Sequence, residues 1–258
     1  MAKTALITGA SAGIGAAFAR LLAKEGFDLV LVARDESRLD SSAKSLASEF
    51  GVHCEVLVSD LSTEDGVMRV EKRIHDAGKE IDVLINNAGF GLRSSFLSTE
   101  LNDELALIDV LARTPMRLMH AILPGMKERN RGTIINVSSV AGWTAGGTYS
   151  AAKSYLTVLS ESLHTELADT NVQVLALAPG FTHTEFHARG KMRMDKLPEF
   201  MWLNVDSVVT QAWADAAEKK AVSIPGRQYK VLAALARFGP RPLVRKLGMK
   251  VRVRQRPK

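Results

Sequence analysis

TGASAGIG, residues 8–15, joins a short apolar run at residues 4–8 to a segment with helical periodicity at residues 12–25. Its glycines have the spacing that a dinucleotide-binding turn needs between a strand and a helix. Gly9 allows the tight turn, Gly13 lets backbone approach a pyrophosphate, and Gly15 lets the helix pack closely on the strand. The helix N-terminus adds free N–H groups and a partial positive charge. We expect a phosphate-binding turn; the alternative is a glycine-rich turn with a structural role alone.

The alternation of short apolar runs and helical stretches continues along the chain. Continuous apolar runs are typical of strands covered on both faces, and repeated βα units build a parallel sheet with right-handed crossovers. The predicted strands are residues 4–8, 27–33, 54–59, 82–86, 133–138, 172–178 and 221–224. The predicted helices are residues 12–25, 37–50, 62–78, a long region to 129 interrupted near Pro115, 148–169 and 207–218. The sequence thus predicts an α/β fold, a doubly wound parallel seven-stranded sheet in a single domain.

The composition is that of an ordinary globular protein, with 258 residues of which 46% are hydrophobic and 24% charged. No apolar run is long enough to predict a membrane-spanning helix. The single cysteine, Cys54, excludes an intrachain disulfide and a multi-cysteine zinc site. The first residues do not have the pattern of a secretion signal, so we expect a reducing, cytoplasmic setting.

Charge is distributed unevenly. Residues 219–258 hold 13 Lys and Arg and no Asp or Glu, so the first 218 residues carry 21 bases against 28 acids. Residues 227–258 form a basic extension, called the tail below, in which apolar positions alternate with bases at helical spacing, interrupted by Gly239-Pro240. This extension could cover a pocket or pack on a neighbouring subunit, lie peripherally on an anionic inner membrane surface, or be disordered. Charge alone also allows nucleic acid, but no recognition motif supports it, and we expect none.

The end of the second predicted strand bears on cofactor choice. In a dinucleotide fold, an acid there binds a free ribose 2′-hydroxyl, whereas a base accommodates a 2′-phosphate. Here Ala33 stands where an acid would be expected and Arg34 follows, with Ser11 and Arg38 as potential helpers. This favours NADP(H) over NAD(H). The alternative is that Arg34 is a solvated loop residue.

A candidate chemical group follows the fifth predicted strand. Tyr149 and Lys153 are four residues apart on a predicted helix, so their side chains share one face. A nearby ammonium favours the phenolate and lowers a tyrosine pKa from its ordinary value near 10. Ser138 and Ser139 end the strand at the carboxyl edge of the sheet, where ligands bind in this fold class. A surface Tyr–Lys pair beside two turn serines is the alternative.

Together these segments resemble the short-chain dehydrogenase/reductase superfamily over roughly residues 3–226. The matching pieces are TGASAGIG (8–15), Asp60-Leu61, NNAG (86–89), INVSS (135–139), Tyr149-Ser-Ala-Ala-Lys153 and Pro179-Gly180 followed by Thr184. The resemblance implies a Rossmann fold over residues 1–226, an NAD(P)-dependent oxidoreductase, and a homodimer or homotetramer.

The resemblance also implies a role for each matching residue. Ser139, Tyr149 and Lys153 would be catalytic, with Tyr149 as acid/base and Lys153 binding the nicotinamide ribose and lowering the tyrosine pKa. Asp60 would hold the adenine amino group, and Asn86 would help to shape the floor of the cleft. The cofactor-binding residues would be Gly9, Ser11, Gly13, Ile14, Gly15, Arg34, Asp60, Leu61, Asn87, Ala88, Gly89, Tyr149, Lys153, Pro179, Gly180 and Thr184. We expect no metal site.

Two departures from the family pattern are visible. Leu111 stands where members often have an asparagine that holds a relay water at a helix irregularity, and leucine cannot bind water through its side chain. The loop from Ser139 to Tyr149 is also shorter than usual. The shorter loop changes the wall of the pocket, and Leu111 leaves open a second function, a slow or inactive NADP(H)-binding regulator or scaffold.

Residues 181–204 interrupt the alternation and are rich in Phe, Met and Trp, among them Met192. With Phe90 and Trp143 they predict an apolar pocket under a mobile lid, or alternatively a packed subunit interface. The leading hypothesis is therefore an oxidoreductase that interconverts a small lipophilic carbonyl compound and its alcohol.

Overall fold

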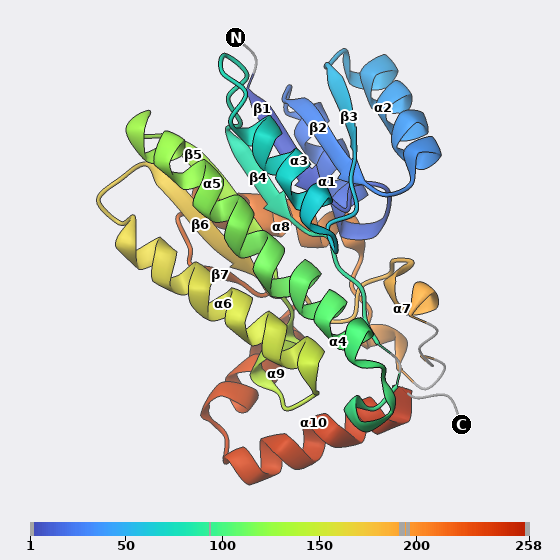
Figure 1. Ribbon diagram of the computed structural model, residues 1–258. Helices are drawn as coiled ribbons and strands as arrows, with labels where there is room; N and C mark the ends of the chain where they lie inside the picture. The colour runs from blue at the N-terminus through green and yellow to red at the C-terminus, as the bar shows by residue number, and fades with distance from the viewer. Residues whose placement is uncertain (1–2, 93, 191–193, 195–196, 256–258) are drawn as a thin grey trace.

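A computed structural model of the chain describes residues 3–92, 94–190, 194 and 197–255. Its centre is a sheet of seven parallel strands in the order β3-β2-β1-β4-β5-β6-β7 (Figure 1). The strands are β1 (Thr4–Thr8), β2 (Asp28–Ala33), β3 (Cys54–Val58), β4 (Val83–Asn86), β5 (Gly132–Val137), β6 (Val172–Leu177) and β7 (Val222–Ser223). The order reverses between β1 and β4, which creates the switch point where ligands bind in such sheets. The predicted doubly wound Rossmann-type fold is confirmed.

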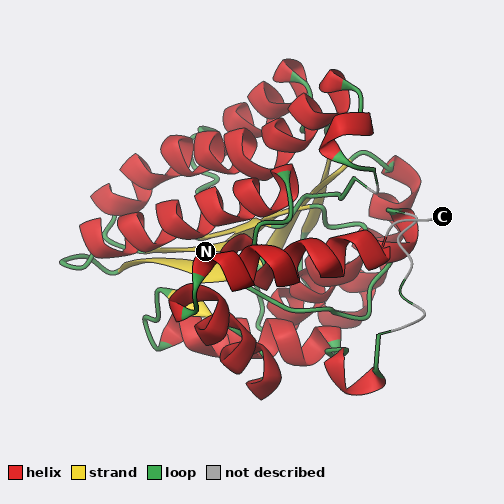
Figure 2. Cartoon of the chain, turned by 90° about the horizontal axis from the view of Figure 1, so that it is seen from below, coloured by secondary structure: helices red, strands yellow, loops and turns green. Residues whose placement is uncertain are grey.

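Helices cover both faces of the sheet (Figure 2). They are α1 (Gly13–Lys24), α2 (Glu36–Phe50), α3 (Glu64–Ile74), α4 (Leu101–Ile108), α5 (Thr114–Glu128), α6 (Thr148–Glu166), α7 (Phe186–Arg189), α8 (Val205–Ala217), α9 (Arg227–Phe238) and α10 (Arg241–Gln255). Short 3₁₀ turns are η1 (Phe96–Ser98), η3 (Val140–Trp143) and η4 (Glu199–Met201). None of the helices within the described part of the chain is long and apolar enough to cross a membrane.

The period of two along each strand divides the core into two halves. On β1, Ile7 packs with α1, α2 and α8, whereas Leu6 packs with α3, α5 and α6. Both side chains are fully buried. Each half of the core therefore depends on alternate strand residues, which explains why the strands read as continuous apolar runs.

The helix interruption predicted near Pro115 is confirmed, and its cause is visible. Asp109–Arg113 forms one π-helical turn between α4 and α5. Pro115 lies in the first turn of α5, where it cannot donate a backbone hydrogen bond to the residue four positions earlier, Leu111. The distortion therefore falls one turn before the proline.

The largest difference from a predicted element bound is at the end of α3. Helix α3 ends at Ile74 rather than near Gly78, because the chain turns at His75 and Gly78 takes a left-handed conformation with φ +80°. Helix α10 follows the predicted interruption at Gly239-Pro240 and extends over Arg241–Gln255. Tyr229, Ala233 and Val244 of α9 and α10 are buried.

Candidate active site

The first turn has the backbone shape that its glycines predict. Gly9 and Gly13 have φ values of +67° and +56°, conformations that other residues rarely adopt. A side chain on Gly15 would clash with the Gly9 carbonyl. No side chain caps α1, whose N-cap is Ala12, and no acid lies in its first turn. The leading N–H groups of α1 thus suit an anion.

The turn after β4 is bonded to the first turn. The Thr8 hydroxyl accepts the N–H groups of Asn87 and Ala88 at 2.9 and 3.0 Å. The Asn87 amide in turn donates to the carbonyls of Thr8 and Gly9 at 2.9 and 3.1 Å. Asn86, just before, is buried and donates to Asn136. Two loops distant in sequence therefore form one rigid edge beside the N-terminus of α1.

Ser139, Tyr149 and Lys153 meet at the carboxyl ends of β4 and β5. The Ser139 hydroxyl lies close enough to that of Tyr149 to favour its ionised form, and it accepts the N–H of Ala141 at 3.1 Å. Lys153 is 5% exposed, donates to the Val137 carbonyl at 2.6 Å, and lies 5.8 Å from the centre of the Tyr149 ring. Ser138 points instead into the core, bonded to Thr157 at 2.6 Å. The short loop still brings Ser139 to Tyr149, since Gly142 lets η3 pack directly on the backbone of α6.

The direction of the tyrosine pKa differs from the expectation. Burial raises the pKa of Tyr149 to about 12, and the Ser139 hydrogen bond only partly opposes this. Burial also lowers the pKa of Lys153 to about 7. In this arrangement desolvation by burial is the largest influence on the tyrosine pKa, so the net shift is upward; the effect of Lys153 on Tyr149 stays a prediction.

Leu111 occupies the π turn beside this group. It is 1% exposed and forms a small apolar cluster with Leu107, Ala112 and Ala152, against which Tyr149 and Phe90 pack. Asp109 pairs with Arg113, and Arg113 also pairs with Glu64 of α3. The helix irregularity is therefore present, but its inner face is apolar.

An arginine with a largely exposed side chain follows the end of β2. The Arg34 side chain is 74% exposed, with Asp60 at 4.0 Å as a loose partner. Arg38, its expected helper, is engaged by Glu185 at 3.0 Å and by Asp35 at 3.4 Å. Ser62 donates to Asp60 and helps to hold its pKa below the ordinary value, although burial opposes this. Arg34 is thus the available cation at this position.

The insert after β6 lies over the first turn and the tyrosine. Thr184 lies against Gly13: a Cβ atom added to Gly13 would be 3.2 Å from the Thr184 side chain. The ring centroids of Phe186 and Tyr149 are 6.0 Å apart. The rings of Phe181, His187 and Trp202 pack together on the other side of Phe186, which His187 contacts. Of the predicted lid residues, Met192 lies outside the described residues.

Tyr229 of α9 is a residue whose position sequence reasoning missed. Its ring is fully buried against Gly180. Its hydroxyl donates to the Met201 carbonyl at 2.6 Å and accepts the Phe181 N–H at 3.0 Å. The tail therefore joins the two ends of the insert, next to Pro179-Gly180.

We expect Tyr229→Phe to lower the melting temperature by roughly 5 °C and to raise the KM for cofactor. The change keeps the ring but removes the partner of the half-buried Phe181 N–H and Met201 carbonyl. A lost partner costs about 1–3 kcal/mol. Gly180→Ala should be far worse, because its Cβ would overlap the Tyr229 ring. Thermal melts and cofactor titrations check both. A Tyr229→Phe protein identical to wild type would contradict this assignment.

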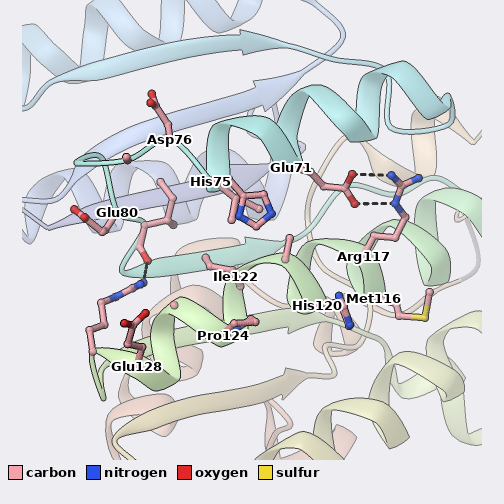
Figure 3. Close-up of a pocket in the computed structure, with 16 residues that line it drawn as sticks. Glu71, His75, Asp76, Glu80, Met116, Arg117, His120, Ile122, Pro124 and Glu128 are labelled. Atoms are coloured by element: carbon pink, nitrogen blue, oxygen red, sulfur yellow. Dashed lines mark hydrogen bonds and ion pairs between the residues drawn. The ribbon is translucent and has the colours of Figure 1, made fainter.

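A cavity of about 1150 Å³ lies elsewhere, as a groove between α3 and α5 (Figure 3). Glu71 and Arg117 pair at one end of it, and His75, His120 and Glu128 line it. Ile81, also in its wall, lies two residues before the start of β4, so the groove is at the amino edge of the sheet, opposite Tyr149. No cluster of three or more His, Cys, Asp or Glu suited to a metal occurs among the described residues.

Comparison with known proteins gives consistent results. The family model described as short chain dehydrogenase matches residues 3–194. The NADP-dependent 3-hydroxy acid dehydrogenase of Schizosaccharomyces pombe is 35% identical over 189 residues, 71% of this chain and 73% of that protein. A short-chain dehydrogenase from Sphingobium yanoikuyae, solved in complex with NADPH, is 35% identical with a TM-score of 0.83, covering 90% and 92% of the chains. The bulky-bulky ketone specific alcohol dehydrogenase from Comamonas testosteroni is 32% identical with a TM-score of 0.79, covering 92% of each.

Proposed function

Because the chain belongs to the short-chain dehydrogenase family, and is thus an NAD(P)-using oxidoreductase acting on CH–OH groups, we propose a specific reaction. It interconverts a lipophilic carbonyl compound and its alcohol, prefers NADP(H), and uses Tyr149 as acid/base. The observation that carries the proposal is the placement of Tyr149 beside Ser139 and buried Lys153, with the Phe186 ring of the insert packed against it.

The residues fit a dinucleotide on physical grounds. The uncapped N-terminus of α1 and the left-handed glycines suit a pyrophosphate. Asp60 would take the adenine end, with Leu61 beside it, and Arg34 a 2′-phosphate. The remaining contacts of the cleft would come from Ser11, Ile14, Asn87, Ala88, Gly89, Pro179, Gly180 and Thr184. The bound nicotinamide supplies hydride chemistry; the protein supplies position and proton control.

In the direction of reduction, Ser139 would hold the substrate carbonyl oxygen through its hydroxyl while Tyr149 donates its proton to that oxygen. A tyrosine pKa of about 12 keeps the phenol protonated at neutral pH, ready for donation. Lys153, when charged, would stabilise the tyrosinate that forms. The apolar cluster around Leu111 and the rings of the lid would exclude water and favour lipophilic substrates.

The test is a screen for NADPH oxidation with purified protein. Bulky aryl ketones, long-chain aldehydes and 3-oxo esters should give higher kcat/KM than acetone or acetaldehyde. The ring cluster of Phe181, Phe186 and Trp202 is the reason for this order. Absence of turnover with every carbonyl class and either cofactor would refute the proposed reaction.

Arg34→Ala should raise the KM for NADPH by about ten- to a hundredfold and leave that for NADH nearly unchanged, because only the 2′-phosphate loses its charged partner. Arg38→Ala should have a smaller effect, since Glu185 already neutralises Arg38. Arg20→Ala, an exposed arginine on α1 paired with Glu49, is the matched control. Steady-state kinetics with both cofactors measures the ratio of the two KM values. An equal rise in the KM for NADH would contradict a role of Arg34 in binding the 2′-phosphate.

We also propose that the protein is a homodimer or homotetramer. In support, large apolar side chains are exposed on α4, α5 and α6, among them Leu101 at 70% and Val158 at 61%. Surfaces of this kind are typical of subunit contacts. A monomer in sedimentation velocity would refute this part.

A further inference from the structure

Helix α9 buries one face and leaves an apolar stripe on the other. Tyr229 and Ala233 face the body of the protein and are buried. Val231, Leu235 and Phe238 are 60%, 62% and 84% exposed. Their spacing of four and three residues puts them on one side of the helix. This stripe is far more apolar than a solvated helix face requires.

The helix that carries the stripe and the helix that follows it also carry exposed positive charge. Arg227, Lys230, Arg241, Arg245 and Lys246 are all exposed on α9 and the first turns of α10. Within the tail to Lys246, whose side chains the structure describes, Arg237 is the base that pairs with the body, through Glu161 at 3.6 Å. No acid occurs in the sequence after Glu218. The exposed bases therefore have no internal countercharge within the tail.

We propose that the outer face of α9 and the start of α10 dock on an anionic lipid bilayer, with Val231, Leu235 and Phe238 inserted among the acyl chains near the headgroups. Exposed bases on the same helices as an exposed apolar stripe fit this partner. The bases would meet the anionic headgroups, and the apolar side chains would meet the acyl chains. A two-fold contact with the same face of a second copy fits worse, since it would bring the bases of one tail against those of the other.

The position of this surface links it to the site. Figure 1 shows α9 and α10 at the end of the molecule opposite the N-terminus, and α9 packs on η3, which follows β5 directly. Gln228 of α9 donates to the carbonyl of Phe200 in the insert at 3.2 Å, and the Phe200 ring is 71% exposed. Docking would therefore hold the insert near the bilayer. The proposal stands on the tail surface alone and does not require the reaction proposed above.

The test is flotation of the full-length protein with phosphatidylcholine vesicles and with vesicles that also contain phosphatidylglycerol. Binding is expected to the anionic vesicles and to weaken as salt is raised. Leu235→Gln/Phe238→Gln should reduce the partition coefficient at least about tenfold. Lys230→Gln/Arg245→Gln/Lys246→Gln should reduce it about a hundredfold, at about fivefold for each base.

Met68→Gln/Leu97→Gln removes two comparably exposed apolar side chains elsewhere, at 53% and 93% exposure, and should bind like wild type. Circular dichroism checks that every variant is folded. Equal flotation of all variants, or none with anionic vesicles, would overturn the proposal. So would a stripe variant that binds vesicles normally but changes oligomeric state in sedimentation velocity, because the stripe would then cover a second copy. Since vesicle binding is measured without turnover, an inactive protein that floats would contradict the reaction alone.

Discussion

Tyr149→Phe should lower kcat for carbonyl reduction by about a thousandfold while leaving NADPH affinity within about twofold. The phenol lies beside Ser139 and the Phe186 ring, and its raised pKa keeps it protonated at neutral pH. Phenylalanine keeps the ring packed against Phe186 and removes only the exchangeable proton. Steady-state NADPH oxidation and a fluorescence titration of NADPH measure the two effects separately.

Tyr155→Phe is the matched control for this change. Tyr155 lies on the same helix, is 41% exposed, and should be replaceable without effect on kcat. Should Tyr149→Phe retain wild-type turnover, Tyr149 could not be the acid/base. Loss of NADPH binding in step with turnover would instead assign it a purely structural role.

Lys153→Met should make the protein more stable at and below neutral pH while nearly abolishing its activity. Burial lowers the lysine pKa from 10.5 to about 7, so between these values the folded state binds fewer protons than the unfolded state. The free energy of unfolding of the wild-type protein therefore rises with pH between about 7 and 10.5. Below pH 7 the buried charged lysine lowers it by the full amount, a few kcal/mol. Methionine removes this destabilisation. It also loses the hydrogen bond to the Val137 carbonyl, which offsets the gain by about 1–3 kcal/mol.

Urea unfolding across this pH range measures the difference between Lys153→Met and wild type. The advantage of the variant should shrink as pH rises toward 10.5, and by then the lost hydrogen bond should make it the less stable protein. Lys44→Met, on the exposed side of α2, is the control and should change stability little at any pH. A constant difference at all pH values would contradict a buried lysine that titrates near neutrality. A gain in stability with a loss of activity is the signature expected of a residue kept for function.

Much of the fold was predictable because its signals are local. Continuous apolar runs predicted each strand to within a residue or two, and TGASAGIG predicted the position and the glycine conformations of the first turn. Pro115 predicted the break in the long helix from the hydrogen bond that it cannot make. Spacing also predicted that Tyr149 and Lys153 share a helix face, since four residues make about one turn.

The rest depends on contacts between distant residues. Arg38 is occupied by Glu185, 147 positions away, so its availability to a phosphate could not be judged from its neighbours. The sign of the Tyr149 pKa shift depends on how many apolar groups surround it, Leu107 and Ala152 among them, rather than on its spacing from Lys153. The period of the tail identified an amphipathic helix but not which residue would enter the core.

The insertion of Tyr229 between Gly180 and Met201 has a consequence for how such chains can diversify. A carboxyl-terminal segment that simply covered the protein could be exchanged between relatives as an independent cassette. Here the same aromatic side chain closes the loop after β6 and fixes the far end of the insert, so a transplanted tail must bring a residue that satisfies both bonds. Changes in the tail and in the insert are therefore expected to occur together rather than separately.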